Sequence, residues 1–383
     1  GIRELVLSRG LGDVYKRQSL YLFHWPLIVL FKNEQSAQLS LSSQATVAIT
    51  AGILAIVTYH LVEHPLRKPG TIWPTNRATA LSFGLALAVL TLTFRYVDSQ
   101  RGFPSRIPAE TRQIIGNVKS EKSKRFQIFR SICKERGWNN CSTPIQSKPN
   151  IFILGDSHGV DALNILQPLW PSFHFIMYSE NSCPPMTLAD FDHAVSRASA
   201  HYEKCMEHTK SLSDGSLSKR ADMVVVSSRY SWYTPKMLDK FLVSLDLPRD
   251  VPIIVFGQAP SFSKDLPEII YRHHDLSNMD AHAAKFLDDN TWQFDENLKQ
   301  VAIRNNAIFI AKAGHFCDRN NNRCQLFHGD SRKLLTYDSH HLSFDSALTL
   351  GKWVTENLPN LPCLLYTSPR PRDRTRSRMP SSA

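Results

Sequence analysis

From residue 148 to residue 357, short apolar runs alternate with amphipathic segments, and this alternation is what most constrains the fold. The runs are short enough for strands and end in glycine or polar residues, which is typical of strands buried on both faces. Strands alternating with helices predict a parallel sheet covered by helices on both faces, so the expected fold class is α/β. The expected strands cover 150–156, 173–179, 221–228, 251–258 and 306–313. The expected helices lie near 160–168, 196–212, 235–245, 293–305 and 344–357.

Three apolar stretches precede this region, over 19–31, 45–62 and 78–94. A helix of about 20 apolar residues crosses the core of a bilayer, so the second and third stretches are long enough to span it. The first is shorter and could be a span whose start is missing. We therefore expect about three transmembrane helices before the α/β domain. Buried helices of a soluble protein are the alternative.

The loops between these stretches predict the orientation in the membrane. The 63–77 loop carries Arg67, Lys68 and Arg77, whereas the 33–44 segment is mostly small and polar. Basic loops stay on the cytoplasmic side, so the third apolar stretch runs outward. Everything after about residue 97 is then expected outside the cytoplasm.

Six of the seven cysteines fall into three close pairs after residue 100. Local pairs in even number indicate disulfides and an oxidising compartment, which agrees with the predicted orientation. Free buried thiols in a cytosolic enzyme are the alternative. No C-x-x-C or Cys/His spacing indicates a zinc site, so no metal is expected. The disulfide candidates are Cys133 with Cys141, Cys183 with Cys205, and Cys317 with Cys324.

The net charge of +11 could indicate a nucleic-acid partner, but its distribution argues against one. Residues 1–17 contribute +2 and residues 363–383 contribute +4, which leaves +5 for the body of the chain. No basic stripe interleaved with aromatic residues appears there. Both ends resemble translated sequencing-adapter read-through, and we expect them to be non-native.

These patterns predict five segments along the chain. We expect a non-native end, C-terminal transmembrane helices of a membrane domain, an extracytoplasmic linker, the α/β domain and a non-native tail. Their expected boundaries are 1–17, 18–97, 98–147, 148–360 and 361–383.

The motif GDSHG follows the first expected strand of the α/β domain. Active sites of parallel sheets gather at the carboxyl ends of strands. There Gly155 permits a sharp turn, and Ser157 falls at the start of a helix, whose N–H groups favour a developing oxyanion. Ser157 is thus a candidate nucleophile that also caps the helix, or it is only an N-cap. Gly155 and Asp156 are candidates for binding the oxyanion or the substrate.

A serine nucleophile needs a base, and YDSHHLS near the end of the chain supplies candidates. Asp338 and His341 have D-x-x-H spacing, which lets the carboxylate orient its own histidine. His340 is the competing base. His158, which follows Ser157, is expected to shape the turn rather than to transfer protons.

GDSH after the first strand, together with D-x-x-H-L-S before the last helix, resembles the SGNH hydrolase-fold family. The resemblance implies a three-layer sandwich in which a parallel sheet lies between helices. It also implies that Ser157 is the nucleophile, His341 the base and Asp338 the group that orients the base.

The flanking sequence is similar to the acyltransferase-3 family of membrane proteins, through SLYLFHWPLIVL, YHLVEHPLRKP and the later SCPPM. One branch of that family carries an extracytoplasmic SGNH domain. The resemblance implies an O-acyltransferase, usually of acetyl, that modifies cell-surface polysaccharide or lipopolysaccharide. It further implies a multi-pass protein of the bacterial inner membrane with a periplasmic SGNH domain. The implied partners are a glycan acceptor and the bilayer, and the implied acyl donor is acyl-CoA, with no cofactor bound by the residues present.

Two departures from the family pattern keep alternatives open. The helices expected to carry the catalytic histidine and arginines of the membrane domain are absent. The usual oxyanion donors, a glycine after the second strand and an asparagine after the third, are absent too. The backbone N–H of Ser157 is then one expected donor and Arg229 is a candidate for another, with an exposed or salt-bridged arginine as the alternative. The alternatives to acyl transfer are an extracytoplasmic carbohydrate esterase or deacetylase and a non-catalytic glycan-binding module.

Overall fold

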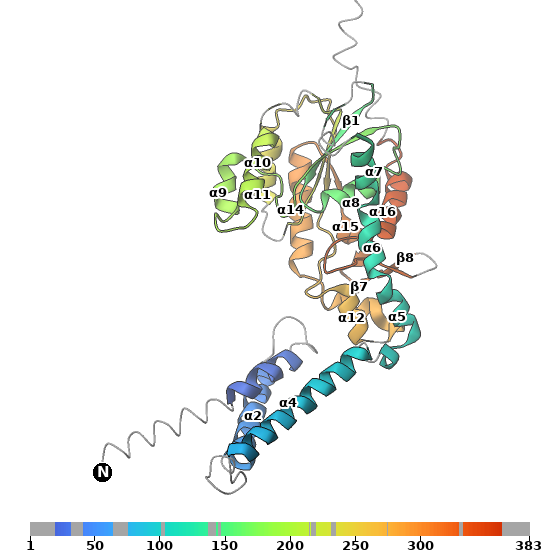
Figure 1. Ribbon diagram of the computed structural model, residues 1–383. Helices are drawn as coiled ribbons and strands as arrows, with labels where there is room; N and C mark the ends of the chain where they lie inside the picture. The colour runs from blue at the N-terminus through green and yellow to red at the C-terminus, as the bar shows by residue number, and fades with distance from the viewer. Residues whose placement is uncertain are drawn as a thin grey trace, which may run out of the picture. The chain divides into compact units, whose positions relative to one another are not determined.

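The computed structural model contains two compact units, residues 1–107 and 108–383. Each unit is considered by itself (Figure 1). The structure describes residues 20–31, 41–63, 76–100, 104–136, 143–144, 147–213, 215, 220–230, 235–273, 275–328 and 332–361.

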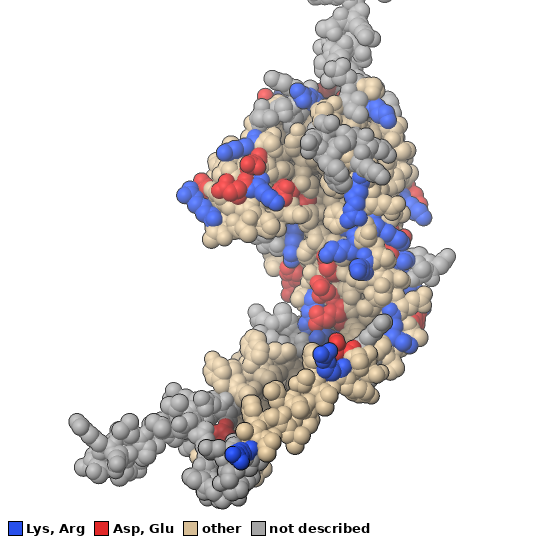
Figure 2. Space-filling model, in the orientation of Figure 1, with Lys and Arg blue, Asp and Glu red and all other residues tan. Residues whose placement is uncertain are grey.

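The first unit is built from apolar helices. A short helix covers Leu20–Phe31. Helix α2 (Leu41–Thr58) continues into the π-helical turn η1 (Tyr59–Glu63), and α4 covers Asn76–Ser99. The large apolar side chains of α4 are mostly exposed, and Figure 2 shows the middle of this helix almost free of charge. An apolar surface of this size is typical of a helix that faces lipid.

By length and composition, two helices of the described residues can cross a membrane, Leu41–Leu61 and Ala80–Ser99. About three spans are expected from the sequence. The helix Leu20–Phe31 is apolar but shorter than the roughly 20 residues that a bilayer requires. The described residues therefore contain two membrane-length helices and one shorter apolar helix.

The second unit contains the predicted parallel sheet, with strand order β2-β1-β3-β4-β5. All neighbouring strands are parallel, and β1 lies between β2 and β3. Each strand lies within an apolar run recognised in the sequence, because strands buried on both faces need continuous apolar residues. The strands are β1 (Asn150–Gly155), β2 (His174–Ser179), β3 (Met223–Ser227), β4 (Ile253–Phe256) and β5 (Ile308–Ile310).

Alternate side chains of each strand enter two separate cores, one on each face of the sheet. In β1, Ile151 and Ile153 enter the core that contains α8 and α16, whereas Phe152 and Leu154 enter the core that contains α10, α11 and α14. The helices that contribute to the core on the first face are α8 (Gly159–Leu166), α12 (Leu266–Arg272), α13 (Met279–Ala284) and α16 (Phe344–Asn357). Those of the second face are α9 (Leu188–Ala194), α10 (Tyr202–Ser213), α11 (Pro235–Ser244) and α14 (Asn290–Arg304). The result is a three-layer α/β sandwich (Figure 1).

The segment expected as a linker, 98–147, differs from that expectation. After the 3-10 turn η2 (Pro104–Arg106) it forms α5 (Ala109–Gly116), α6 (Val118–Arg125) and α7 (Gln127–Arg136). Ile114 and Ile132 enter the core of the second unit. The segment looks polar because part of what it buries is charged, and hydropathy patterns do not register buried ion pairs.

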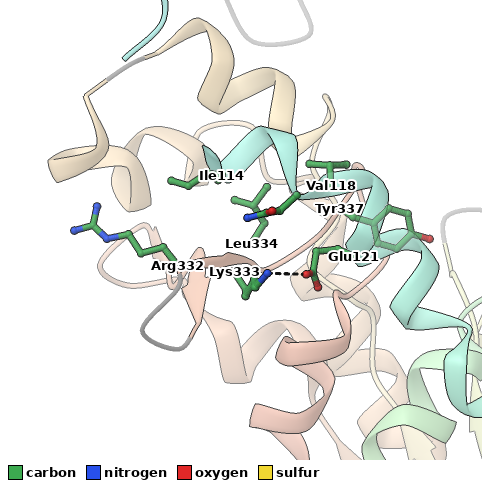
Figure 3. A pocket seen from close by; sticks show the side chains of 8 residues that line it. Ile114, Val118, Glu121, Arg332, Lys333, Leu334 and Tyr337 are labelled. Atoms are coloured by element: carbon green, nitrogen blue, oxygen red, sulfur yellow. Dashed lines mark hydrogen bonds and ion pairs between the residues drawn. The ribbon is translucent and has the colours of Figure 1, made fainter. Parts of the chain in front are cut away.

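A small cavity shows how these helices pack (Figure 3). It lies between α5, α6 and the strand β9 (Lys333–Leu334), and is about 10 Å³, room for at most one water molecule. Lys333 of β9 donates to the buried carboxylate of Glu121 in α6 at 3.0 Å, and Tyr337 also lines the cavity. The polar helices are therefore joined to the loop that carries Asp338 and His341.

Two short hairpins follow the sheet. One pairs β6 (Cys317–Asp318) with β7 (Arg323–Cys324), and the other pairs β8 (Phe327–His328) with β9 (Lys333–Leu334). Helix α15 (Lys312–Phe316) precedes them. Cys317 and Cys324 are direct cross-strand neighbours and form a disulfide.

A second disulfide joins Cys183, after β2, to Cys205 in α10. Cys133 in α7 is also disulfide-bonded, and its expected partner Cys141 lies outside the described residues. All these cysteines lie in the second unit, which agrees with an oxidising environment for it.

Candidate active site

Ser157 lies in the turn between β1 and α8, at the carboxyl edge of the sheet. Gly155 ends β1 where β3 approaches closely, because a Cβ on it would lie 2.0 Å from the carbonyl oxygen of Ser227. A glycine is therefore required there by packing. Helix α8 has His158 at its N-cap position and no side-chain cap. Ser157 Oγ bonds to His341 and does not cap the helix, which corrects that part of the expectation.

The structure brings Ser157, His341 and Asp338 together. His341 Nε2 lies 2.8 Å from Ser157 Oγ, and His341 Nδ1 lies 2.7 Å from Asp338 Oδ2. Because a carboxylate only accepts, Nδ1 carries the proton of the neutral ring and Nε2 accepts from the serine hydroxyl. This is the arrangement in which a histidine can act as a general base toward a serine.

Asp338 is held in its ionised form by its surroundings. Its Oδ1 accepts the backbone N–H groups of His340 and His341 at 3.0 and 2.8 Å. Burial raises the pKa of Asp338, but the hydrogen bond and charge of His341 together with these N–H groups lower it below its ordinary value. The loop geometry follows from D-x-x-H spacing just before α16, whose N-cap is Ser343.

The His341 ring lies in an aromatic stack. The ring of His158 is 4.8 Å away on one side at 21°, and the ring of Tyr337 is 5.7 Å away at 3°. Stacked neighbours restrict rotation of the imidazole, so the stack keeps Nε2 directed at Ser157.

Of the three candidates for oxyanion or substrate binding, Arg229 has a side-chain donor without a partner among the described residues. Both carboxylate oxygens of Asp156 accept, from the N–H groups of His158 and Arg229 at 2.9 Å each. Asp156 therefore holds the turn, and Gly155 serves the packing of β1 against β3. Among the described residues, Arg229 Nε has no hydrogen-bond partner although it is buried. The backbone N–H of Ser157 likewise has no hydrogen-bond partner among the described residues.

A network of buried charged residues contacts the turn that carries Ser157, and the sequence patterns do not predict it. Arg125 of α6 is fully buried, pairs with Asp161 of α8 at 2.9 Å and donates to the carbonyl oxygen of Ser157 at 2.5 Å. Burial raises the pKa of Asp161, but the charge of Arg125 and the contact with His158 lower it well below its usual range. Arg125 lies in VKSEKSKR, a run that predicts nothing beyond a solvated face.

Asp161 also contacts a histidine pair that extends toward the triad. Its Oδ2 lies 3.0 Å from His158 Nδ1, and His158 Nε2 lies 3.2 Å from His340 Nδ1. His158 therefore does more than shape the turn. The H-x-x-D spacing in HGVD is a signal that could have predicted the first contact, since these residues share a helix face.

A second buried cation, Lys312, supports the same turn from α15. It donates to Ser227 Oγ at 3.1 Å, and Ser227 Oγ donates to the carbonyl oxygen of His158 at 2.9 Å. Burial lowers the pKa of Lys312, while nearby carboxylates, with Asp161 first, oppose that shift. Nothing in its sequence context predicts this position.

The described residues contain one cluster with metal-binding potential, His158, His340 and His341, with one ring nitrogen of each within 4.8 Å of the others. Both nitrogens of His341 are already bonded, to Asp338 and Ser157. His158 is bonded to His340 and contacts Asp161. A metal ion here would have to break the Ser157–His341 bond or leave His341 out of its ligand set.

Solved structures of known proteins are similar to this chain. The periplasmic domain of a lipopolysaccharide acetyltransferase from Salmonella ser. Paratyphi A is 15% identical, with a TM-score of 0.51, covering 64% of this chain and 99% of that one. A carbohydrate acetylesterase family member from Sinorhizobium meliloti is 13% identical, with a TM-score of 0.32, covering 57% and 99%. A search of curated proteins finds no match. The first of these structures supports the fold.

The family is shown by a family model that matches well over half of the chain. It describes an SGNH domain fused to AT3 domains and matches residues 127–355, a region that contains all strands of the sheet together with Ser157, Asp338 and His341. The chain therefore belongs to the family of SGNH domains that are fused to AT3 domains.

Proposed function

We propose that this chain is an O-acyltransferase whose SGNH domain passes an acyl group, with acetyl as the expected group, through Ser157 to a cell-surface glycan. An SGNH domain of this family indicates an enzyme that acts on acyl groups. The observation that carries the proposal is the bonded chain Ser157–His341–Asp338, with distances of 2.8 and 2.7 Å. A non-catalytic glycan-binding module would have no need of this geometry.

In the first step, His341 Nε2 removes the proton of Ser157 as Oγ attacks the acyl carbonyl. The acyl–leaving-group bond breaks, the leaving group takes the proton from His341, and an ester forms on Ser157. Asp338 stays ionised and stabilises the imidazolium that exists between these events. The Ser157 N–H is the donor we propose for the oxyanion, and the guanidinium of Arg229 is the candidate for a second one.

In the second step, a sugar hydroxyl attacks the ester. His341 takes the hydroxyl proton, the new ester bond forms on the sugar, and Ser157 Oγ leaves with the proton returned by His341. The membrane part of such a protein would deliver the acyl group from cytoplasmic acyl-CoA, with the SGNH domain in the periplasm. The two membrane-length helices and the disulfides of the second unit support this placement.

Hydrolysis is the competing outcome. The side chains of His341 and Asp338 are 15% and 28% exposed, so water can reach the ester. If water is the physiological acceptor, the protein is a carbohydrate esterase. A product analysis that weighs transfer against hydrolysis separates the two.

Fluorophosphonate labelling of the full chain in detergent tests the nucleophile. We expect Ser157→Ala to abolish labelling, and His341→Ala to slow it by about 10³-fold or more. Because His341 contacts Ser157 directly, His340→Ala should reduce the rate far less. The matched control is Ser172→Ala, since Ser172 is exposed and precedes β2, at the opposite end of the strand from the site. Labelling that persists in Ser157→Ala would overturn the proposal.

A further inference from the structure

His340 ends a second Asp–His chain that lies beside the triad and that the proposed mechanism does not use. The chain runs from Asp161 through His158 to His340. The His340 and His341 rings are consecutive in sequence, with centroids 4.1 Å apart. Any role for His340 in the reaction rests on the proposed function of Ser157.

The tautomers along this chain follow from its buried end. Burial lowers the pKa of His158 well below its ordinary value, so its ring is neutral and carries one proton. Asp161 is ionised and its oxygen lies 3.0 Å from His158 Nδ1, off the N–H axis. Even off that axis, the negative charge of the carboxylate repels a lone pair on Nδ1 and attracts an N–H at this distance, so the proton sits on Nδ1.

The position of that proton determines the state of His340. Nε2 of His158 is then an acceptor, and the atom 3.2 Å from it, His340 Nδ1, must donate. In neutral His340 the remaining nitrogen, Nε2, therefore has a free lone pair. Among the residues that the structure describes, none bonds to it, and the side chain is half-buried at the site.

His340 also stays neutral at physiological pH. Burial, and after it the positive charges of His341 and Arg229, lower its pKa to about 4, against the opposing effect of Asp338 and Asp161. Nε2 of His340 is thus an acceptor at physiological pH. Two unprotonated Nε2 atoms then lie on adjacent rings, one bonded to Ser157 and one open.

We propose that His340 Nε2 binds the acceptor by taking a hydrogen bond from one hydroxyl of a vicinal diol, while the neighbouring hydroxyl faces His341. Adjacent sugar oxygens lie close enough for two neighbouring imidazoles to hold both. The attacking hydroxyl gives its proton to His341 and its oxygen bonds to the acyl carbon. The second hydroxyl keeps its proton and only holds the sugar in place, so His340 selects carbohydrate diols over single alcohols and water.

The partition of the acyl-enzyme between two small alcohols tests this proposal. The full chain in detergent is given p-nitrophenyl acetate as the donor, with ethanediol or ethanol as the acceptor at equal hydroxyl concentration. The acetate esters and free acetate are quantified by gas chromatography. We expect wild type to favour ethanediol per hydroxyl, and His340→Asn to lower the ethanediol-to-ethanol ratio about tenfold, the usual effect of one lost hydrogen bond.

His340→Asn is the informative change because its amide N–H can still donate to His158, so the buried chain is kept while Nε2 is removed. His340→Ala serves as the second variant if the first does not fold, with the same expected ratio. An ethanediol-to-ethanol ratio equal to that of wild type in a labelling-competent variant would overturn the inference. If wild type and Ser157→Ala instead release p-nitrophenolate at the same rate, the proposed function is overturned.

Discussion

Arg125 connects the nucleophile turn to a helix that lies just before the matched family region. Its guanidinium bonds both to Asp161 and to the carbonyl oxygen of Ser157, and its side chain is completely buried. A planar fork of donors can hold two acceptors at once, which a lysine ammonium on a flexible stem does less well. Arg125 is therefore a positioning residue for Ser157.

Arg125→Lys tests that role. We expect the rate of fluorophosphonate labelling to fall about tenfold, because lysine can keep its charge beside Asp161 but loses the second bond to Ser157. Arg112→Lys, on the exposed face of α5, is the matched control and should label at the wild-type rate. Rates that are equal in both variants would refute the role, and the thermal midpoint reports any loss of stability separately.

Asp295 predicts a pH dependence of stability. It accepts the N–H of Gln258 at 2.6 Å, and burial raises its pKa to about 7, although that bond and the charge of Lys312 lower it. In the unfolded chain the same carboxyl loses its proton near pH 4. The folded state then binds more protons between about pH 4 and pH 7, so this group makes stability fall as pH rises through that window, by at most about 4 kcal/mol.

Asp295→Asn should remove that part of the decline, because asparagine accepts the same hydrogen bond and has no proton to lose. We expect the thermal midpoint of the variant minus that of wild type to increase from pH 5 to pH 8. Scanning calorimetry of the full chain in detergent measures it. A difference that stays constant over this range would contradict the assignment.

At the scale of elements, the close approach of β1 and β3 depends on one glycine. A Cβ at Gly155 would lie 2.0 Å from the Ser227 carbonyl oxygen, so Gly155→Ala must push the two central strands apart. We expect a loss of about 3 kcal/mol in the free energy of unfolding, the upper range for overpacking. Gly116→Ala in α5 is the control, because nothing lies within 4 Å of its Cβ position and alanine favours a helix. A Gly155→Ala chain as stable as Gly116→Ala would contradict the packing.

The strands and the long helices of the sandwich could be predicted because their apolar residues are continuous or periodic. Ser157, Asp338 and His341 could be picked out because two short motifs carry them, and the structure brings them together. Helices α5–α7 could not be predicted from the sequence, because some of the side chains that they bury are charged, as at Glu121 and Arg125. The hairpins β6–β9 have strands of two residues, too short for any period.

The network around the site was hidden for a related reason. Burial of Arg125 and Lys312 is stabilised by partners distant in sequence, Asp161 and Ser227 among them. One sequence gives the order of the residue types, but it does not reveal which charged side chains contact each other in the folded protein. Only Asp161 had a local signal, through its spacing from His158.

At the scale of the whole molecule, the proposed topology can be tested by cysteine accessibility. In a Cys363→Ser background, a cysteine at Val243, which is exposed on α11, should react with a membrane-impermeant maleimide in cells whose outer membrane is permeabilised. A cysteine at Lys68, in the basic segment 63–77, should react only after lysis. The opposite pattern would place the SGNH domain in the cytoplasm and contradict the proposed localisation.

The central claim is that Ser157 carries the acyl group between donor and acceptor. Rapid acid quench of the full chain with p-nitrophenyl acetate, followed by peptide mass spectrometry, tests it most directly. We predict one acetyl group on the peptide that contains Ser157, absent in Ser157→Ala and lost over time when ethanediol is added. An acetyl group on a different residue, or turnover with Ser157 never acetylated and unaffected by Ser157→Ala, would contradict the account.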